Sequence, residues 1–138
     1  MVLAVSLDYS KLTPGKKILV QNYVLDSETI QRYIDAVGGN IPRSDGTGSL
    51  NLVPPMAIAS LWLRGVIKEL EIPGGTLHVG QELEFTQAAR IGDRIECTAT
   101  ILQNTVRKNI RFMVVQLKVT NDVCQPIMLG KGTLTLPE

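Results

Sequence analysis

The sequence predicts an α+β fold in which an antiparallel sheet of about five strands wraps around one long central helix. Three observations lead to this expectation. The chain has 138 residues, enough for one domain, 1–138, with a continuous apolar core. One segment in the middle of the chain is apolar on nearly every side of a helix. Four segments with the alternation of strands follow it.

The first elements are a strand and a short amphipathic helix. Apolar and polar side chains alternate over 17–25, which predicts a strand. Asp26 or Ser27 can then accept hydrogen bonds from the free N–H groups of a first helical turn. Gly38 ends this helix. Its apolar stripe consists of Ile30, Tyr33, Ile34 and Val37.

A long loop and the central helix come next. Residues 40–52 are rich in turn-forming types, and loops of this length commonly carry function. The helix is expected at 55–70, where Pro55 occupies a first-turn position that needs no N–H group. The Pro-Gly-Gly sequence at 73–75 ends it. Because its apolar residues face all directions, the helix should be mostly buried.

The remaining segments predict four strands, at 76–87, 93–103, 109–120 and 125–136, with turns at 91–93, Asn104 and 121–122. Simple alternation puts His78 on the polar face of its strand with Glu82 and Glu84, opposite Leu83.

The third of these strands is apolar on both faces, so it should be central. Such a sheet keeps an open edge after it wraps around one helix, and open edges are usually paired or covered. The chain is therefore expected to dimerise.

Composition excludes several classes of function. Fourteen Lys and Arg balance 13 Asp and Glu, leaving a net charge of +1, which disfavours nucleic acid as a partner. Neither a membrane-spanning segment nor a signal peptide is indicated, so a cytoplasmic location is expected. Cys97 and Cys124 lack C-x-x-C spacing, which favours two reduced, packing cysteines over a metal site.

Five sequence motifs occur in an order that resembles a known family. They are SETIQRY at 27–33, AVGG at 36–39, VPPM at 53–56, GTLHVGQELEF at 75–85 and RIGD at 90–93. In order and spacing they resemble the MaoC-like hydratases and dehydratases and the FAS1-like dehydratase domain, which have the hot-dog fold. The resemblance implies an acyl thioester, on coenzyme A or acyl carrier protein, held in a tunnel at a dimer interface. It implies no nicotinamide, flavin or metal.

The catalytic positions of that family are replaced in this sequence. Active members resemble a Gly-Asp-x-Asn-Pro-x-His pattern, whose Asp and His act as the acid/base pair. In the best register Gly39 stands at the Asp position and Ser44 at the His position. Pro55 stands where the family has a glycine whose N–H faces the thioester oxygen, and proline has no such N–H. No catalytic residue is therefore predicted in this chain.

The leading hypothesis is an acyl-thioester-binding subunit of a 3-hydroxyacyl dehydratase or (R)-specific enoyl-CoA hydratase system. A catalytic MaoC-like chain would supply the Asp and His in a heterodimer. One alternative is a self-sufficient homodimeric hydratase or thioesterase that uses Asp45 or His78. Another is a non-enzymatic acyl-CoA binder. The predicted substrate-binding residues are Val53, Pro54, Pro55, Met56, Ala59 and Trp62.

Each candidate residue also has a purely structural interpretation. His78 is more simply a solvated or interface histidine, and Asp45 a turn residue. Met56 and Trp62 fit ordinary core packing as well as a tunnel wall. A basic cluster of Arg107, Lys108 and Arg111 can meet phosphates or an acidic carrier, but a solvated hairpin end is the commoner case.

Overall fold

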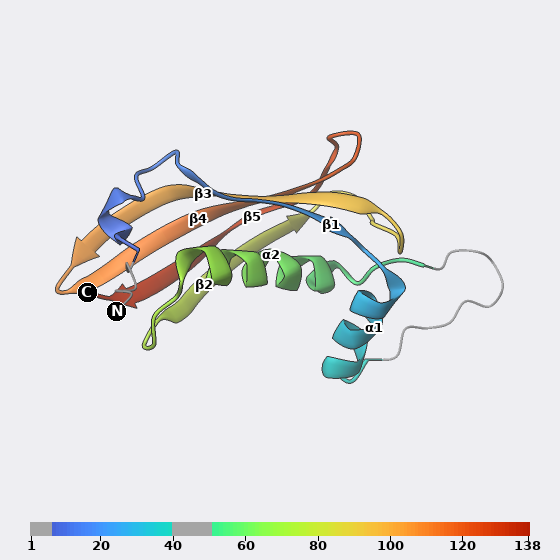
Figure 1. Cartoon of the computed structure of the whole chain (residues 1–138), viewed down its shortest axis with the longest axis horizontal. Helices are drawn as coiled ribbons and strands as arrows, with labels where there is room; N and C mark the ends of the chain where they lie inside the picture. Colours follow the sequence, from blue (N-terminus) through green and yellow to red (C-terminus); the bar gives the residue numbers. More distant parts are fainter. Residues whose placement is uncertain (1–6, 40–50) are drawn as a thin grey trace, which may run out of the picture.

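The computed structural model describes residues 7–39 and 51–138 (Figure 1). Five strands form one sheet in the order β1-β3-β4-β5-β2, and every neighbouring pair is antiparallel. The elements are a 3-10 helix at Tyr9–Lys11, β1 at Lys17–Val24, α1 at Ser27–Ala36, α2 at Pro55–Leu70, β2 at Leu77–Phe85, β3 at Arg94–Arg107, β4 at Ile110–Asn121 and β5 at Pro126–Pro137. The predicted class is confirmed, and the strand predicted to be central, β4, is the third of the five.

Both helices start as the sequence predicts. The Oδ1 atom of Asp26 accepts a hydrogen bond from the Thr29 N–H at 2.7 Å, which caps α1 and holds the pKa of the Asp26 carboxyl below its usual value. Pro54 and Pro55 open α2. On α1, Ile30 and Ile34 are buried, but Val37 is 59% exposed because it lies at the C-terminal cap, beyond the last helical turn.

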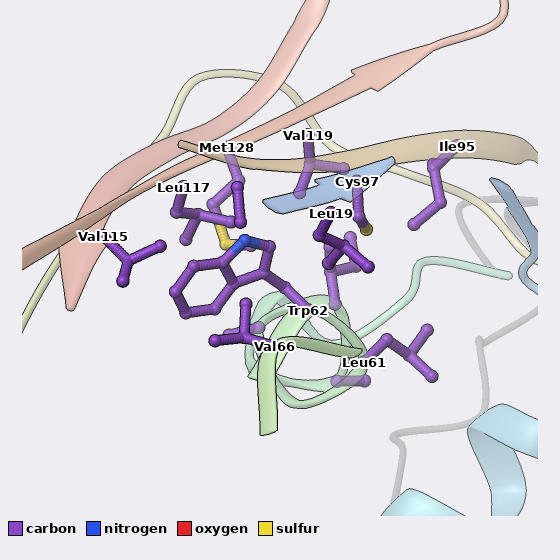
Figure 2. Packing of buried hydrophobic residues seen from close by; sticks show 14 of the residues in the cluster. Leu19, Leu61, Trp62, Val66, Ile95, Cys97, Val115, Leu117, Val119 and Met128 are labelled. Atoms are coloured by element: carbon purple, nitrogen blue, oxygen red, sulfur yellow. The ribbon is translucent and has the colours of Figure 1, made fainter. Parts of the chain in front are cut away.

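The core lies between α2 and the inner face of the sheet. Trp62 projects from the middle of α2 and is 2% exposed. Its indole N–H donates to the Thr98 carbonyl at 3.1 Å, which satisfies the polar atom of the ring and fixes its orientation. Figure 2 shows the indole among Val115, Leu117 and Met128 of the neighbouring strands.

The register shifts once in each of the four strand pairs, and two of these bulges bear on candidate residues. The register between β3 and β4 shifts between Ile101 and Gln103, and the register between β2 and β5 shifts between His78 and Gly80. Because side chains alternate with a period of two, one extra residue places every residue beyond it on the face opposite to the one that uninterrupted alternation predicts.

The predicted turn at Asn104 is wrong, because β3 continues beyond the first bulge. The strand β3 continues through Asn104 to Arg107, and the turn lies at Lys108 and Asn109, whose φ angles are 50° and 62°. Two consecutive residues with positive φ form a tight hairpin whose twist matches the flanking strands. Asn104 pairs with Met113 and therefore lies on the inner face of the sheet.

The inward side chain of Asn104 takes part in a buried polar network. Its Oδ1 accepts from Nη1 of Arg111 at 2.7 Å, and its Nδ2 donates to the carbonyls of Tyr9 and Leu12 at 2.7 and 2.9 Å. Nη2 of Arg111 donates to Glu138 at 2.6 Å. Because Arg111 is only 7% exposed, the expected solvated hairpin end is wrong for Arg111, whereas Arg107 and Lys108 are exposed near the hairpin turn.

The two cysteines differ in environment. Cys97 is fully buried, and burial raises the pKa of its thiol to about 12, so it is an unreactive core residue. Cys124 is exposed in the turn before β5, so the expectation that both cysteines pack is wrong for Cys124.

Across residues 7–39 and 51–138, no helix has the length and hydropathy needed to cross a membrane. The same residues contain no cluster of three or more metal-ligating side chains.

Candidate functional site

Two adjoining cavities lie along α2. The mouth cavity, of about 540 Å³, lies where α1 meets the start of α2, and its described lining is Tyr33, Ile34, Val37, Gly39, Leu52, Val53, Pro54, Pro55, Met56 and Ala88. The inner cavity, of about 190 Å³, lies between α2 and β2, and is lined by Tyr33, Met56, Ala59, Ser60, Trp62, Leu63, His78, Gln81 and Leu83. Tyr33 and Met56 line both cavities, so the two adjoin at these side chains.

The structure brings all the predicted substrate-binding residues to these two cavities. Val53, Pro54 and Pro55 line the mouth cavity, and Ala59 and Trp62 line the inner cavity. Met56 lies between them and is half exposed. Their role in binding stays a prediction. Pro55, Met56, Ala59 and Trp62 lie together because of their spacing on the first two turns of α2, and Val53 and Pro54 directly precede that helix.

The start of α2 offers few hydrogen-bond donors to the mouth cavity. Pro54 and Pro55 have no backbone N–H, and the N–H of Ala57 donates to the Pro54 carbonyl at 2.9 Å. The first turn of most helices carries several free N–H groups, which can stabilise a negatively charged oxygen. In this chain that capacity is reduced by two consecutive prolines.

The described lining of both cavities contains no carboxylate. Its polar groups are the Tyr33 and Ser60 hydroxyls, the His78 imidazole and the Gln81 amide. The Ser60 hydroxyl donates to the Ala57 carbonyl at 2.8 Å, within its own helix. An acid/base pair of one carboxylate and one imidazole is therefore not formed by the described residues.

His78 lies on the inner face of the sheet, which contradicts the expected grouping with Glu82 and Glu84. It pairs with Leu134, which is buried, whereas Glu82 pairs with Lys131 on the outer face. The bulge at Val79 is the physical reason, because it adds one residue between these two parts of β2.

Three side chains converge at Gly132 on β5. A Cβ atom at this glycine would lie 3.2 Å from Oε1 of Gln81, 3.6 Å from Nε2 of His78 and 3.6 Å from Cη2 of Trp62. The absence of a side chain at Gly132 therefore lets two polar groups of β2 and the indole ring converge close to the β5 backbone.

Other candidates from the sequence lie elsewhere. Ser44 and Asp45 fall outside the described residues. Gly39 lines the mouth cavity, at the place where the family resemblance puts an aspartate.

Tyr33 and Gln81 are not among the residues predicted to bind substrate. The position of Tyr33 on the apolar stripe of α1 was a usable signal, since a hydroxyl at the border of such a stripe often faces a cavity or water. For Gln81 the signal was Gly80, because a glycine inside a strand often marks a bulge.

Comparison with protein families finds one match. The sequence profile described as "FAS1-like, dehydratase domain region" matches residues 13–129. No curated protein sequence matches the chain.

Several solved structures share its fold. The unliganded R-hydratase PhaJ1 from Pseudomonas aeruginosa is similar with a TM-score of 0.79 and 20% identity, covering 94% of this chain and 85% of that one. The (R)-hydratase from A. caviae involved in PHA biosynthesis has a TM-score of 0.76 and 16% identity over 92% of this chain and 98% of that one. The truncated HadBC complex, a 3R-hydroxyacyl-ACP dehydratase from Mycobacterium tuberculosis, has a TM-score of 0.72 and 18% identity over 95% and 99% of the two chains.

Proposed function

We propose that this chain, which belongs to the FAS1-like dehydratase domain family and has a hot-dog fold, binds the acyl part of a thioester. A partner would carry the catalytic Asp and His. The reaction would be the reversible addition of water to an enoyl thioester, or dehydration of a 3-hydroxyacyl thioester. The thioester would be carried by coenzyme A or acyl carrier protein.

One observation carries the proposal: two adjoining, mainly apolar cavities follow α2, and their described lining contains no carboxylate. Apolar walls stabilise a hydrocarbon chain by about 0.8 kcal/mol for each buried CH₂ group. Adding water to an enoyl thioester also requires a general base, a general acid and donors to the enolate oxygen. The described residues supply the walls, but they supply neither a carboxylate–imidazole pair nor N–H donors at Pro54 and Pro55.

A second hot-dog chain is the proposed partner, and the edge strand β2 is its proposed contact. This strand pairs only with β5 in the sheet, so its other side presents backbone groups for a further strand. Apolar side chains lie exposed on β2 and α2, namely Leu77, Val79, Phe85, Met56 and Ile67. Since His78, Gln81 and Leu83 of β2 line the inner cavity, a partner at this edge would also close that cavity.

The test measures hydration of short and long trans-2-enoyl-CoA substrates by this chain alone and with a catalytic MaoC-like chain encoded near it. We expect no turnover by the lone chain, and turnover of long substrates by the pair. Robust turnover by the lone chain would contradict the proposal.

A blocking variant tests the cavities within the same experiment. Met56→Trp places a large ring between the two cavities and should lower the activity of the pair on long substrates more than on short ones. Lys68→Trp is the matched control, because Lys68 is exposed on the same helix and lines neither cavity. Equal effects of the two variants would argue against acyl binding along α2.

A self-sufficient enzyme is the second candidate, and the inward position of His78 favours keeping it. An imidazole in the inner cavity can act as a general base if a substrate carbonyl reaches it. Loss of lone-chain turnover in His78→Ala or Asp45→Asn would support this candidate. Ligand-dependent thermal stabilisation with no product and no co-purifying subunit would instead indicate a non-enzymatic binder.

A further inference from the structure

We infer that His78 and Gln81 form a polar end to the inner cavity, which selects an acyl chain carrying an oxygen function far from the thioester over a plain hydrocarbon chain of the same length. This inference rests on the proposed function, because it assigns a chemical class to the acyl group that the cavity would hold.

The orientation of both side chains follows from strand pairing. On β2, Gln81 pairs with Gly132 and Leu83 with Gly130, while beyond the bulge His78 pairs with Leu134. Paired residues of antiparallel strands share a face, so His78, Gln81 and Leu83 all face α2. The bulge at Val79 thus turns toward the cavity a histidine that simple alternation would turn outward.

The atoms available to a ligand are specific. Nε2 of Gln81 donates to the Lys131 carbonyl at 3.2 Å, which orients the amide and leaves Oε1 as an acceptor beside Gly132. Nε2 of His78 approaches the same point, and no hydrogen bond joins its imidazole to another described residue. An acceptor on Gln81 and an imidazole that can donate or accept suit a hydroxyl group, which does both.

The third wall at this point is apolar and rigid. Cη2 of Trp62 lies beside Gly132 as well, and the indole is held by its hydrogen bond to Thr98. The absence of a side chain at Gly132 lets these three side chains converge at the wall of the inner cavity. A ligand atom in the cavity beside them would contact the indole on one side and two polar groups on the other.

The pair lies farther along α2 than the mouth cavity, on the edge strand β2, and both side chains are exposed in the single chain. Trp62 follows Met56 by six residues, which corresponds to about 9 Å along the helix axis. A thioester at the start of α2 would place the carbons next to its carbonyl near Met56, well before His78 and Gln81. The polar pair would therefore meet a later part of the acyl chain.

Selectivity follows from the cost of covering polar atoms. A hydrocarbon chain end would remove water from His78 and Gln81 without replacing its hydrogen bonds, whereas a hydroxyl group would replace them. Sites built around hydrogen bonds discriminate strongly against analogues that lack the bonding group.

The experiment compares binding of paired acyl-CoA ligands to the chain, in the assembly in which it purifies, by titration calorimetry. Hexanoyl-, octanoyl- and decanoyl-CoA are each compared with the same thioester hydroxylated at the terminal carbon of its acyl chain. We expect one length at which the hydroxylated ester binds about tenfold tighter, as one good hydrogen bond provides. His78→Phe and Gln81→Leu should each abolish this preference while the plain ester still binds.

Glu84→Gln is the matched control, because Glu84 is an exposed polar residue of the same strand and pairs with Leu129 on the outer face. It should leave the preference unchanged. Binding of plain and hydroxylated esters without preference, or a preference that survives both His78→Phe and Gln81→Leu, would overturn the inference and leave the proposed function standing. Absence of binding for every ester would overturn both.

Discussion

The sheet turns polar side chains toward its inner face at two places, and the two differ in how those side chains are satisfied. In both places a bulge is the cause, at Leu102 on β3 and at Val79 on β2. The first leads to Asn104 and the second to His78. The difference between these two ends of the sheet separates a structural role from a ligand-binding one.

At the Asn104 end the protein itself satisfies the polar groups. Asn104 accepts from Arg111 and donates to two backbone carbonyls of the N-terminal segment, and Arg111 also pairs with Glu138. This network ties the 3-10 helix and the last residue of the chain to the central strands. Of the Arg111 guanidinium only Nε lacks a partner among the described residues.

At the His78 end the polar groups face a cavity at the edge of the sheet. The strand β2 has one neighbour in the sheet, and His78 and Gln81 converge beside Gly132, which has no side chain. Polar groups that line a cavity beside an apolar wall are typical of ligand sites. The comparison therefore predicts that changes at Asn104 affect stability, and that changes at His78 affect binding.

The largest expected effect is that of Asn104→Leu. It removes the hydrogen bonds of the Asn104 amide to Nη1 of Arg111 and to the carbonyls of Tyr9 and Leu12, and each buried group left unpaired costs about 1–3 kcal/mol. Arg111 keeps Glu138, and the Tyr9 carbonyl keeps the Leu12 N–H. We expect the free energy of unfolding in urea to fall by about 3 kcal/mol or more. The control is Gln103→Leu on the exposed outer face, which should change it by less than about 0.5 kcal/mol. Similar losses for both would break the comparison.

A smaller effect is expected for Glu138→Gln. The side chain of Glu138 is 37% exposed, so water screens its ion pair with Arg111, and an amide still accepts a hydrogen bond. We expect a loss of at most about 1 kcal/mol in the free energy of unfolding, and less at high salt. A loss as large as that of Asn104→Leu would mean that charge, rather than the amide of Asn104, holds this end together.

Asp26 caps α1 and lies outside both ends of the sheet, so it gives a reference for the effect of a single helix cap on stability. The hydrogen bond from the Thr29 N–H lowers the pKa of this carboxyl from its ordinary 3.8. Its contribution to stability is therefore fully present above pH 3.8 and is lost as the pH falls through the lower folded value. Asp26→Asn, which still caps the helix, should reduce the fall in melting temperature below that pH and change little at pH 7. If Asp26→Asn leaves the dependence of melting temperature on pH unchanged, protonation of Asp26 does not contribute to acid unfolding.

The smallest expected effect on stability is that of combined His78→Phe and Gln81→Leu. The described residues make no hydrogen bond to the His78 imidazole. The hydrogen bonds of the Gln81 amide to the carbonyls of Glu82 and Lys131 are exposed, so water can replace them. We expect the free energy of unfolding in urea to change by no more than about 0.5 kcal/mol. A loss near that of Asn104→Leu would show that both ends are structural.

Much of the fold could be predicted from local sequence signals. The class, the order of the elements and the central position of β4 follow from periodicity, and the helix starts follow from Asp26 and Pro55. The predicted binding residues on the first turns of α2 lie together for the same reason, because a helix places neighbouring turns on one side by itself.

What the sequence by itself determined, then, is the kind and order of elements and the apolar helix at their centre, since caps, prolines and hydrophobic period act within a few residues. Only the tertiary structure decided which faces Asn104 and His78 take and that Arg111 is buried rather than exposed. A bulge exists only in relation to the strand beside it, so the face of every residue beyond it depends on pairing with a distant part of the chain.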